Sequence, residues 1–567
     1  MSDYSYSDFS INELGSFYEK ERTVFRVFAP DFDELYLVCN SERYRMEKKH
    51  HTFEITLVGD HERQRYHYER ADGISFRDPF SYMCDHDDSY VLDKDKFIKE
   101  AIKPKECEGL FIYEMNVRDF SISPSFPGKS HGKFDALVES GLKLHDYFVC
   151  GLDYLKNTGI NCIQLMPVFD YDLDHSSYNW GYNPLSYNSV YSGYISDSED
   201  CYAYVNELRR TVNELHRNDI RVNLDVVFNH VYDFRSFDMD KMIPGHVFRY
   251  KEDGSVAEGT FCGNEIRSED PFMSAYIVEM CRRYIEIFDI DGLRLDLMGI
   301  MDIDTVKAIR DEARKMKKDF MVYGEGWNMG DVLDEDRRAT IKNAASLESV
   351  MMFNDQYREI ISDYVAGNNV DIAKVKEAIS ASSYLDESQS LNYIECHDGY
   401  TFFDRLIVFK SFYPIGVNLK RCRLGLALTM ISRGMPFVQM GQEFYRTKKL
   451  ADNSYNLDDS YNEIDWNRRV EYNLSCDYFK ALVKIRKDNK ELWDKYAKIE
   501  FHEFERCLIY DIGSLRIYIN PSDDDYLCES EEENHIIFNG EGECDFTTKT
   551  IAIEACSLVI GRRVCYN

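Results

Sequence analysis

Eight short apolar runs, spaced along residues 110–443, constrain the fold of this chain more than any other feature. In chain order they read LFIYEMNV, INCIQLMPV, IRVNLDVVF, DGLRLDLMG, FMVYGEGW, SLESVMMFN, LNYIECHD and MPFVQMGQE. Each run has the length of a strand, and segments with helical patterns lie between them. Alternation of apolar strands with amphipathic helices is typical of an α/β fold with a parallel sheet.

Two of the intervening segments show the helical pattern clearly. Each carries an apolar residue every three or four positions, which is the spacing of one helix face. These positions are Val205, Leu208, Val212 and Leu215 in the first segment, and Val306, Ile309, Ala313 and Met316 in the second. Eight strand-helix units predict a (β/α)8 TIM barrel, which we assign to residues 105–495.

The sequence on both sides of the predicted barrel has strand patterns instead. Short alternating pieces between turn residues over 23–92 predict an N-terminal β-sandwich within residues 1–104. The charged stretch 93–109 is interpreted as a linker. The same alternation predicts a C-terminal all-β domain of the sandwich type at 496–567, in which the acidic stretch 521–534 is interpreted as a solvated turn.

The formal net charge of -33 restricts the partners of the chain. Phosphate backbones and anionic lipids would be repelled, and no basic run offers them a site, so we expect neither nucleic acid nor membrane binding. A neutral polysaccharide meets no such penalty, and the 41 Tyr and 35 Phe residues supply faces for stacking on sugars. Solubility is the simpler explanation of the acidity.

Signals for export and for disulfide formation are missing from the sequence. The stretch MSDYSYSDFSINELGSFYEKE has no basic region followed by an apolar one, and no apolar stretch reaches the roughly 18 residues of a membrane span. The 16 Cys residues are scattered without CxxC spacing or clusters with His, which supports neither zinc nor a disulfide framework. We therefore expect a cytoplasmic protein with reduced thiols and no cofactor.

Acidic residues close four of the predicted strands. They are Asp225, Asp296, Glu325 and Asp398. Because the active site of such a barrel lies at the carboxyl ends of its strands, we expect these side chains to face one site. Any single one is equally well explained as a cap for the following helix. Four together, with His230 and His397 beside them, favour a catalytic cleft.

Two of these acids are predicted to differ in protonation. Arg294 and Asp296 lie two residues apart on one strand, so the guanidinium lies beside the carboxylate and favours its ionised form. Glu325 stands between Gly324 and Gly326 after an apolar run, and desolvation favours its protonated form. An anionic nucleophile beside a protonated acid suits glycoside hydrolysis, and a carboxyl separation of about 5 Å would indicate the retaining route.

The segments DVVFNH, GLRLDLMG, VYGEGW and YIECHD, in this order, resemble the four signature regions of the α-amylase superfamily of retaining glycosidases. Together with YEMNVRDFS and YNWGYNP, they are similar to the type I pullulanases, which hydrolyse α-1,6 branch points. The similarity extends from about Leu14 to Trp466, and its first part resembles a β-sandwich classed with glycogen-binding modules. All four Trp residues lie outside that part, so we expect it to have a structural role.

The resemblance implies a role for each matched residue. Asp296 is expected to be the nucleophile, Glu325 the acid/base, and Asp398 the third acid, which grips the substrate and stabilises the oxocarbenium-like transition state. Asp225 is expected to orient the site from within the barrel. The substrate-binding residues that the resemblance implies are Tyr182, His230, Arg294, Trp327, His397 and Asn453.

One matched motif departs from the family pattern, because YEMNVRDFS has Asn116 where His is common. Some superfamily members bind calcium, but the sequence locates no calcium site, and we assign no metal ligand. The expected substrate is an α-glucan such as pullulan, glycogen, starch or a branched maltodextrin, and the oligomeric state stays open. Two alternatives also stay open, an α-1,4-acting or bifunctional amylopullulanase and a non-catalytic glucan-binding protein.

Overall fold

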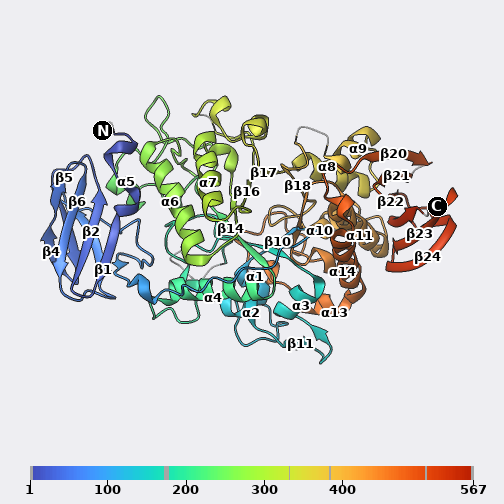
Figure 1. Cartoon of the computed structure of the whole chain (residues 1–567), viewed down its shortest axis with the longest axis horizontal. Helices are drawn as coiled ribbons and strands as arrows, with labels where there is room; N and C mark the ends of the chain where they lie inside the picture. The colour runs from blue at the N-terminus through green and yellow to red at the C-terminus, as the bar shows by residue number, and fades with distance from the viewer. Residues whose placement is uncertain (1–3, 172–177, 331, 382–384, 505–506, 564–567) are drawn as a thin grey trace.

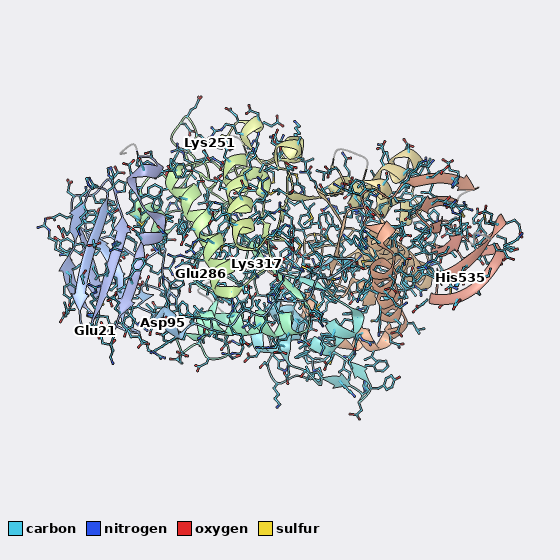
Figure 2. The ribbon with its side chains drawn as sticks, in the orientation of Figure 1. Glu21, Asp95, Lys251, Glu286, Lys317 and His535 are labelled. Atoms are coloured by element: carbon cyan, nitrogen blue, oxygen red, sulfur yellow. The ribbon has the colours of Figure 1, made fainter. Side chains whose placement is uncertain are left out.

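The computed structural model of the chain describes residues 4–171, 178–330, 332–381, 385–504 and 507–563. Antiparallel sheets form one end of the elongated molecule, a closed barrel its middle, and a further sheet its other end (Figure 1). Glu21, in the turn that precedes β2, and His535, in the C-terminal sheet, lie toward opposite ends (Figure 2). None of the helices in the described ranges combines the length and apolar character needed to cross a bilayer.

All eight apolar runs form strands of one closed parallel barrel, so the predicted fold class is confirmed. The strands are β10 (Ile112–Met115), β13 (Cys162–Leu165), β14 (Arg221–Val226), β15 (Gly292–Leu295), β16 (Met321–Gly324), β17 (Met351–Phe353), β18 (Ser390–Asn392) and β19 (Met435–Gln439). Each pairs with the next in chain order, and β19 closes the ring on β10. Parallel pairing places the carboxyl ends of all eight strands on the same face.

Helices surround the barrel and fill the connections between its strands. They are α1 (Val117–Ser121), α2 (Phe134–Val138), α3 (Gly151–Thr158), α4 (Ala203–Arg217), α5 (Asp238–Met242), α6 (Pro271–Phe288), α7 (Ile303–Met316), α8 (Asp355–Val365), α9 (Ile372–Ser380), α10 (Phe402–Phe409), α11 (Ile415–Ile431), α12 (Asp459–Asn462), α13 (Trp466–Glu471) and α14 (Asn473–Asp488).

The predicted apolar helix faces are buried, with one exception. The four predicted positions of α4 and the first three of α7 belong to the core, whereas Met316, the last residue of α7, is 39% exposed. The buried face of α7 therefore ends at Ala313, one turn before the end of the helix. A second departure lies between β16 and β17, where the short 3₁₀-helices Glu335–Arg337 and Ile341–Ser346 replace the expected α-helix. The second of these helices contacts the segment after β16, because the Ile341 N–H donates to the Gly326 carbonyl at 2.8 Å.

Two antiparallel sheets pack together at the N-terminal end. One contains β1 (Gly15–Glu19), β2 (Arg22–Phe28), β6 (Thr52–Val58) and β5 (Glu47–Lys49), and the other contains β4 (Glu42–Arg45), β3 (Leu35–Cys39), β7 (Arg65–Arg70), β8 (Ser75–Phe76) and β9 (Ser89–Tyr90). Aromatic side chains join them to the barrel. The ring of Phe28 stacks on that of Phe272 in α6, with centroids 4.8 Å apart.

The stretch interpreted as a linker is held against the barrel along α4. Arg209 Nη2 donates to the carbonyl of Glu100 at 2.6 Å, and Asn213 Nδ2 donates to the same oxygen at 3.0 Å. One turn further, His216 Nδ1 lies 2.7 Å from the carbonyl of Ile102. These contacts give the irregular backbone the partners that its carbonyl groups need when buried.

The C-terminal strands form a six-stranded antiparallel sheet. Its order is β20 (Ile499–Phe504), β21 (Cys507–Ile512), β22 (Leu515–Asn520), β25 (Ser557–Arg563), β23 (Tyr526–Asn539) and β24 (Gly542–Ile553). One face packs on α11 and α14. The solvated turn predicted at 521–534 is wrong from Tyr526 onward, because the acidic residues lie on β23. On this strand Cys528 and Asn534 are buried while Glu529 and Glu532 are exposed, with a register irregularity between Glu529 and Asn534.

Phe272 is the residue whose truncation should weaken the join between the N-terminal sheets and the barrel. It is fully buried, and the rings of Phe28 and Phe9 lie 4.8 and 5.0 Å from its own. Phe272→Ala should lower the free energy of unfolding by about 3–5 kcal/mol in denaturant titrations, since it leaves a cavity. Phe412→Ala, at a 72% exposed position, should change it by less than about 0.5 kcal/mol. Equal losses would contradict this account.

Candidate active site

The pairing of β14, β15 and β16 places three of the acidic residues singled out in the sequence next to one another. In the parallel register, Asp225 of β14 lies opposite Arg294 of β15, and Arg294 lies opposite Tyr323 of β16. Asp296 and Glu325 come two residues after Arg294 and Tyr323. They therefore emerge side by side where β15 and β16 end, on the carboxyl face of the barrel.

One buried guanidinium joins three of these side chains. Arg294 Nη1 donates to Asp225 Oδ1 at 3.0 Å and to Asp296 Oδ1 at 2.7 Å, while Nη2 donates to Glu325 Oε1. The contact with Asp296 is the one expected from the spacing, whereas the other two depend on strand register. Burial lowers the pKa of Arg294, but the charges of Asp225 and Glu325 outweigh it and hold that pKa well above its usual value.

Asp296 is held from a second side by Asn229. The Nδ2 group of Asn229 donates to Asp296 Oδ2 at 2.8 Å and to the Asp296 carbonyl at 2.7 Å. The next residue, Leu297, has a φ of 40°, which a non-glycine residue adopts only when its surroundings impose it. Its N–H donates to Glu325 Oε2 at 3.0 Å. Asp296 thus accepts from side chains instead of capping a helix.

Glu325 lies in a closely packed and dry position. A Cβ added to Gly324 would collide with the carbonyl of Leu295, and one added to Gly326 would lie 2.9 Å from the nitrogen of Ile341, so both glycines permit close packing. Burial raises the pKa of Glu325 to about 8, against the lowering by Arg294 and together with the charge of Asp296. The carboxyl is therefore protonated at neutral pH, in the direction that its sequence context predicted.

The buried Asp225 is also bonded by the half-buried Tyr182. Tyr182 OH donates to Asp225 Oδ2 at 2.6 Å, and Gln164 Nε2 donates to the same oxygen at 3.4 Å. Burial raises the pKa of Asp225 to about 6, although Arg294 lowers it. The Tyr182 ring also stacks on His397, with centroids 4.7 Å apart and planes at 16°. Tyr182 consequently links the acids to the histidine.

His397 is held by Glu114 of β10, a residue that sequence reasoning missed. Glu114 Oε1 lies 2.7 Å from His397 Nδ1, and Oε2 accepts from the His397 N–H at 2.8 Å. Burial lowers the pKa of His397, but the charges of Asp398 and Glu114 raise it to about 9. The imidazole is therefore charged at neutral pH. A signal for Glu114 existed, because it lies within YEMNVRDFS on an apolar strand.

Asp398 does not close its strand, contrary to the expectation from the sequence. Strand β18 ends at Asn392, and Asp398 lies six residues further, in the turn that precedes α10. This turn is held from inside, where Glu395 Oε2 accepts from the Phe402 N–H at 2.7 Å. The Asp398 side chain is 43% exposed, and its Oδ2 lies 3.6 Å from His397 Nε2. Its carboxylate is thus accessible to solvent.

His230 joins the cluster through its neighbours. Its Nε2 lies 2.8 Å from the Tyr182 carbonyl, and its Nδ1 lies 2.5 Å from Asn229 Oδ1. Burial lowers its pKa, although Asp296 raises it. Asn229 therefore touches both His230 and the carboxylate of Asp296. It stands directly before His230 in DVVFNH, which is the signal that could have identified it.

Two of the predicted substrate-binding residues lie outside the acid cluster. Trp327, two residues beyond Glu325, is partly buried, and its Nε1 donates to Asp355 Oδ2 at 2.5 Å. Asn453 is exposed, and its Oδ1 accepts from the Tyr455 N–H at 3.3 Å. The contacts of the described residues do not join Asn453 to the acids. Neither side chain bonds the acidic residues of the site.

Asn116, the departure in YEMNVRDFS, has a local structural explanation. It is the N-cap of α1, and its Oδ1 accepts from the N–H groups of Arg118 at 2.8 Å and Asp119 at 3.2 Å. Asn is among the preferred residues at this position because its side chain satisfies otherwise unpaired amide groups. The change from His therefore leaves Glu114 and its contact with His397 in place.

A cavity of 1160 Å³ lies at the opposite end of the barrel. Its lining includes Glu108, Asn161 and Asp219, which precede β10, β13 and β14. None of the predicted site residues lines it, and the amino ends of barrel strands serve stability more than chemistry. Throughout the described ranges, no group of three or more His, Cys, Asp or Glu residues is arranged to hold a metal ion.

Comparisons with known proteins agree with this geometry. The family model described as "Alpha amylase, catalytic domain" matches residues 149–243. The chain is 31% identical to the pullulanase of Bacillus subtilis (strain 168) over 512 residues, which cover 84% of this chain and 71% of that protein. It is 25% identical to pullulanase A of Streptococcus pneumoniae serotype 2 over 460 residues, 67% of this chain but only 36% of that longer protein.

A solved structure shows the same architecture. The crystal structure of pullulanase type I from Bacillus subtilis, complexed with maltose, superposes with a TM-score of 0.93 and 28% sequence identity. The match covers 97% of this chain and 85% of that one. The likeness thus extends over the N-terminal sheets, the barrel and the C-terminal sheet together.

The raised pKa of Glu325 predicts how stability depends on pH. The unfolded chain loses this proton near pH 4.5 and the folded chain near pH 8, so stability should fall as pH rises through that window. Glu325→Gln cannot titrate, so its melting temperature relative to the unchanged protein should increase from about pH 5 to about pH 8.

The exposed Glu335 supplies the matched control. A hydrogen bond from Lys342 lowers its pKa, so its contribution to stability is lost only as the pH falls below the unfolded value. Glu335→Gln should therefore track the unchanged protein between pH 5 and pH 8. A melting difference for Glu325→Gln that is constant over this range would show that Glu325 is ionised in the folded protein.

Proposed function

The chain belongs to the pullulanases of the α-amylase family, and we propose that it hydrolyses α-1,6 linkages of α-glucans by a retaining double displacement, with Asp296 and Glu325 as its catalytic pair. The Bacillus subtilis relative and the superposed crystal structure are both pullulanases, and that crystal structure contains maltose. The observation that carries the proposal is the shared guanidinium of Arg294, which holds Asp296 and Glu325 together.

In the first step, Asp296 attacks the anomeric carbon of the glucose whose bond is cleaved. The bond from that carbon to the linking oxygen breaks, and Glu325 transfers its proton to the oxygen of the departing chain. The products are a glycosyl ester on Asp296 and a shortened glucan. In the second step a water attacks the ester, Glu325 takes the water's proton, and Asp296 returns as a carboxylate.

The geometry supports the retaining route rather than the inverting one. An inverting enzyme keeps its carboxyls roughly 6.5–9.5 Å apart to leave room for a water, whereas a retaining one keeps them about 5 Å apart. Asp296 and Glu325 both bond terminal nitrogens of one guanidinium, and these nitrogens share one carbon atom. That arrangement favours the smaller separation.

Other residues around the pair are assigned to the sugar that is attacked. Asp398 presents a 43% exposed carboxylate, which suits hydrogen bonding to sugar hydroxyls and stabilisation of the cationic transition state. His397 and Arg294 add positive charge beside it. Tyr182, half-buried and fixed by Asp225 and His397, supplies an aromatic platform. Trp327 and Asn453 are assigned to neighbouring subsites.

The chemical class of the substrate is an α-glucan, and we extend it to pullulan, glycogen, starch and branched maltodextrins. A cytoplasmic location is supported by the cysteines, since those of the described residues, Cys507 left aside, form no disulfide. The net charge of -33 supports the absence of nucleic acid or anionic membrane as a partner. The N-terminal sheets at 1–104 are assigned a structural role, as is the C-terminal domain at 496–567.

Removal of either catalytic carboxyl tests the proposal. Asp296→Asn and Glu325→Gln should each lower kcat on pullulan by at least ~10³, because each abolishes one role in the double displacement. Both variants should remain folded, and Glu325→Gln should still bind substrate. Asp336→Asn, an exposed acid in the β16–β17 connection, is the control and should stay within about twofold. Near-normal activity of either catalytic variant would remove that residue from its role.

The products formed from pullulan separate the proposal from its rivals. Cleavage of α-1,6 linkages alone releases maltotriose, an α-1,4-acting enzyme releases a panose-type trisaccharide, and a bifunctional enzyme releases products of both cuts. A protein that binds glucan without cleaving it releases neither. Chromatography of the products therefore decides among a debranching hydrolase, an amylopullulanase and a glucan-binding protein.

Tyr182 should contribute through its hydroxyl and through its ring. Tyr182→Phe leaves the buried Asp225 without its 2.6 Å donor, which should lower kcat/KM by about 10-fold. Tyr182→Ala also removes the platform and should lose a further 5- to 150-fold or so in kcat/KM. Thermal melts separate this from simple destabilisation, in which activity would follow the unfolded fraction. A folded and fully active alanine variant would refute the platform.

A further inference from the structure

A buried lysine lies beneath the turn that carries Asp398. Lys448 follows β19 in GQEFYRTKK, and its side chain is only 1% exposed. Its Nζ donates to the carbonyl of His397 and, at 3.1 Å, to the carbonyl of Gly399. These are the two residues on either side of Asp398. The ammonium therefore fixes the backbone on both flanks of the third acid.

The hydrogen bonds of Lys448 go to backbone carbonyls and not to a carboxylate. Within the described part of the chain, no carboxylate oxygen forms a salt bridge with its Nζ, although the charges of Asp398 and Glu395 attract it from further away. The centroid of the Trp180 ring lies 5.0 Å from Nζ. Burial lowers the pKa of Lys448. A buried ammonium without a carboxylate in direct contact is unfavourable for stability, which argues that its hydrogen bonds to the turn serve another purpose.

The carboxylate of Asp398 depends on its backbone for its position, because its own side-chain contacts are weak. Its carboxylate lies 3.6 Å from His397 Nε2, which is too long for a strong hydrogen bond, and its side chain is 43% exposed. The following residue, Gly399, has a φ of 73°, so the turn is set by backbone conformation. The backbone of Lys448 is itself anchored, because its N–H donates to Asp404 Oδ2 at 2.7 Å. The support is therefore rigid.

We propose that Lys448 is a positioning residue of the debranching reaction. It holds the Asp398 turn in the position from which the Asp398 carboxylate reaches the substrate. This inference rests on the proposed function. Lys448 does not touch the sugar, since its side chain is buried and bonds the backbone of the turn. Its effect on catalysis passes through the position of Asp398.

Lys448→Met tests the role with a side chain of similar length that cannot donate hydrogen bonds. It should lower kcat/KM on pullulan by about 100-fold, the loss expected from a misplaced catalytic group. Lys449→Met is the matched control, because the neighbouring Lys449 is exposed and bonds Ser460 Oγ at 2.8 Å. It should stay within about twofold. An active Lys448→Met variant, within about threefold of the unchanged protein, would overturn the proposal.

A double-mutant cycle with Asp398→Asn distinguishes positioning from a general loss of structure. If Lys448 acts through the Asp398 carboxylate, Lys448→Met should cost less than about fivefold in the Asp398→Asn background. An undiminished 100-fold loss in that background would show that Lys448 supports the whole site instead, and would also overturn the proposal.

Lys448→Gln covers the case in which the methionine variant does not fold, since its amide keeps two N–H donors. The expected order of kcat/KM is the unchanged protein, then Lys448→Gln, then Lys448→Met. A Lys448→Gln variant that melts normally but is as inactive as Asp398→Asn would contradict the proposal, because its amide should still hold part of the turn. Activity of the unchanged protein separates the two claims. If it releases no maltotriose the proposed function fails, whereas an active protein with an equally active Lys448→Met variant refutes only the role of Lys448.

Discussion

The buried guanidinium of Arg294 is the interaction on which the rest of the site depends. Three carboxyl groups contact it, and with all three ionised the cluster would hold three negative charges against one positive charge, in a region that excludes water. Such an excess is too unfavourable to persist, so the site holds protons instead. Burial accordingly raises the pKa of Glu325 to about 8 and that of Asp225 to about 6. The proton that general acid catalysis requires is therefore a consequence of how the charges are packed.

The barrel makes this packing possible because it fixes the strand ends relative to one another. Strand register sets Asp225 beside Arg294, and the glycines at 324 and 326 let the segment after β16 pack closely. The second half of the site is built differently, since Asp398 lies on a turn. There the fixed groups are Glu114, which holds His397, and Lys448, which holds the backbone. Tyr182 connects both halves through Asp225 and His397.

The sequence predicted what local patterns encode. Apolar runs and helix faces located all eight barrel strands, and the two-residue spacing of Arg294 and Asp296 predicted their contact. The contact of Arg294 with Glu325 could not be predicted in the same way, because it depends on the register of strands that no short-range pattern specifies. Asn229 and Glu114 were missed for a similar reason: their partners are distant in the chain. The errors at Met316 and in the acidic stretch arose where a helix ended or a strand had an exposed polar face.

In the proposed double displacement, Glu325 has to act as an acid and then as a base, and the same electrostatics suit it to both roles. The negative charge of Asp296 is one of the causes that raise the pKa of Glu325, after burial itself, while Arg294 lowers it. In the proposed first step Asp296 becomes a glycosyl ester, so its negative charge disappears but the guanidinium stays. The pKa of Glu325 must then fall, just when its carboxylate is needed to take a proton from water. Hydrolysis of the ester restores the charge of Asp296 and with it the affinity of Glu325 for a proton. In this proposal the charge of Asp296 couples the protonation of Glu325 to the covalent state of Asp296, while Arg294 stays constant.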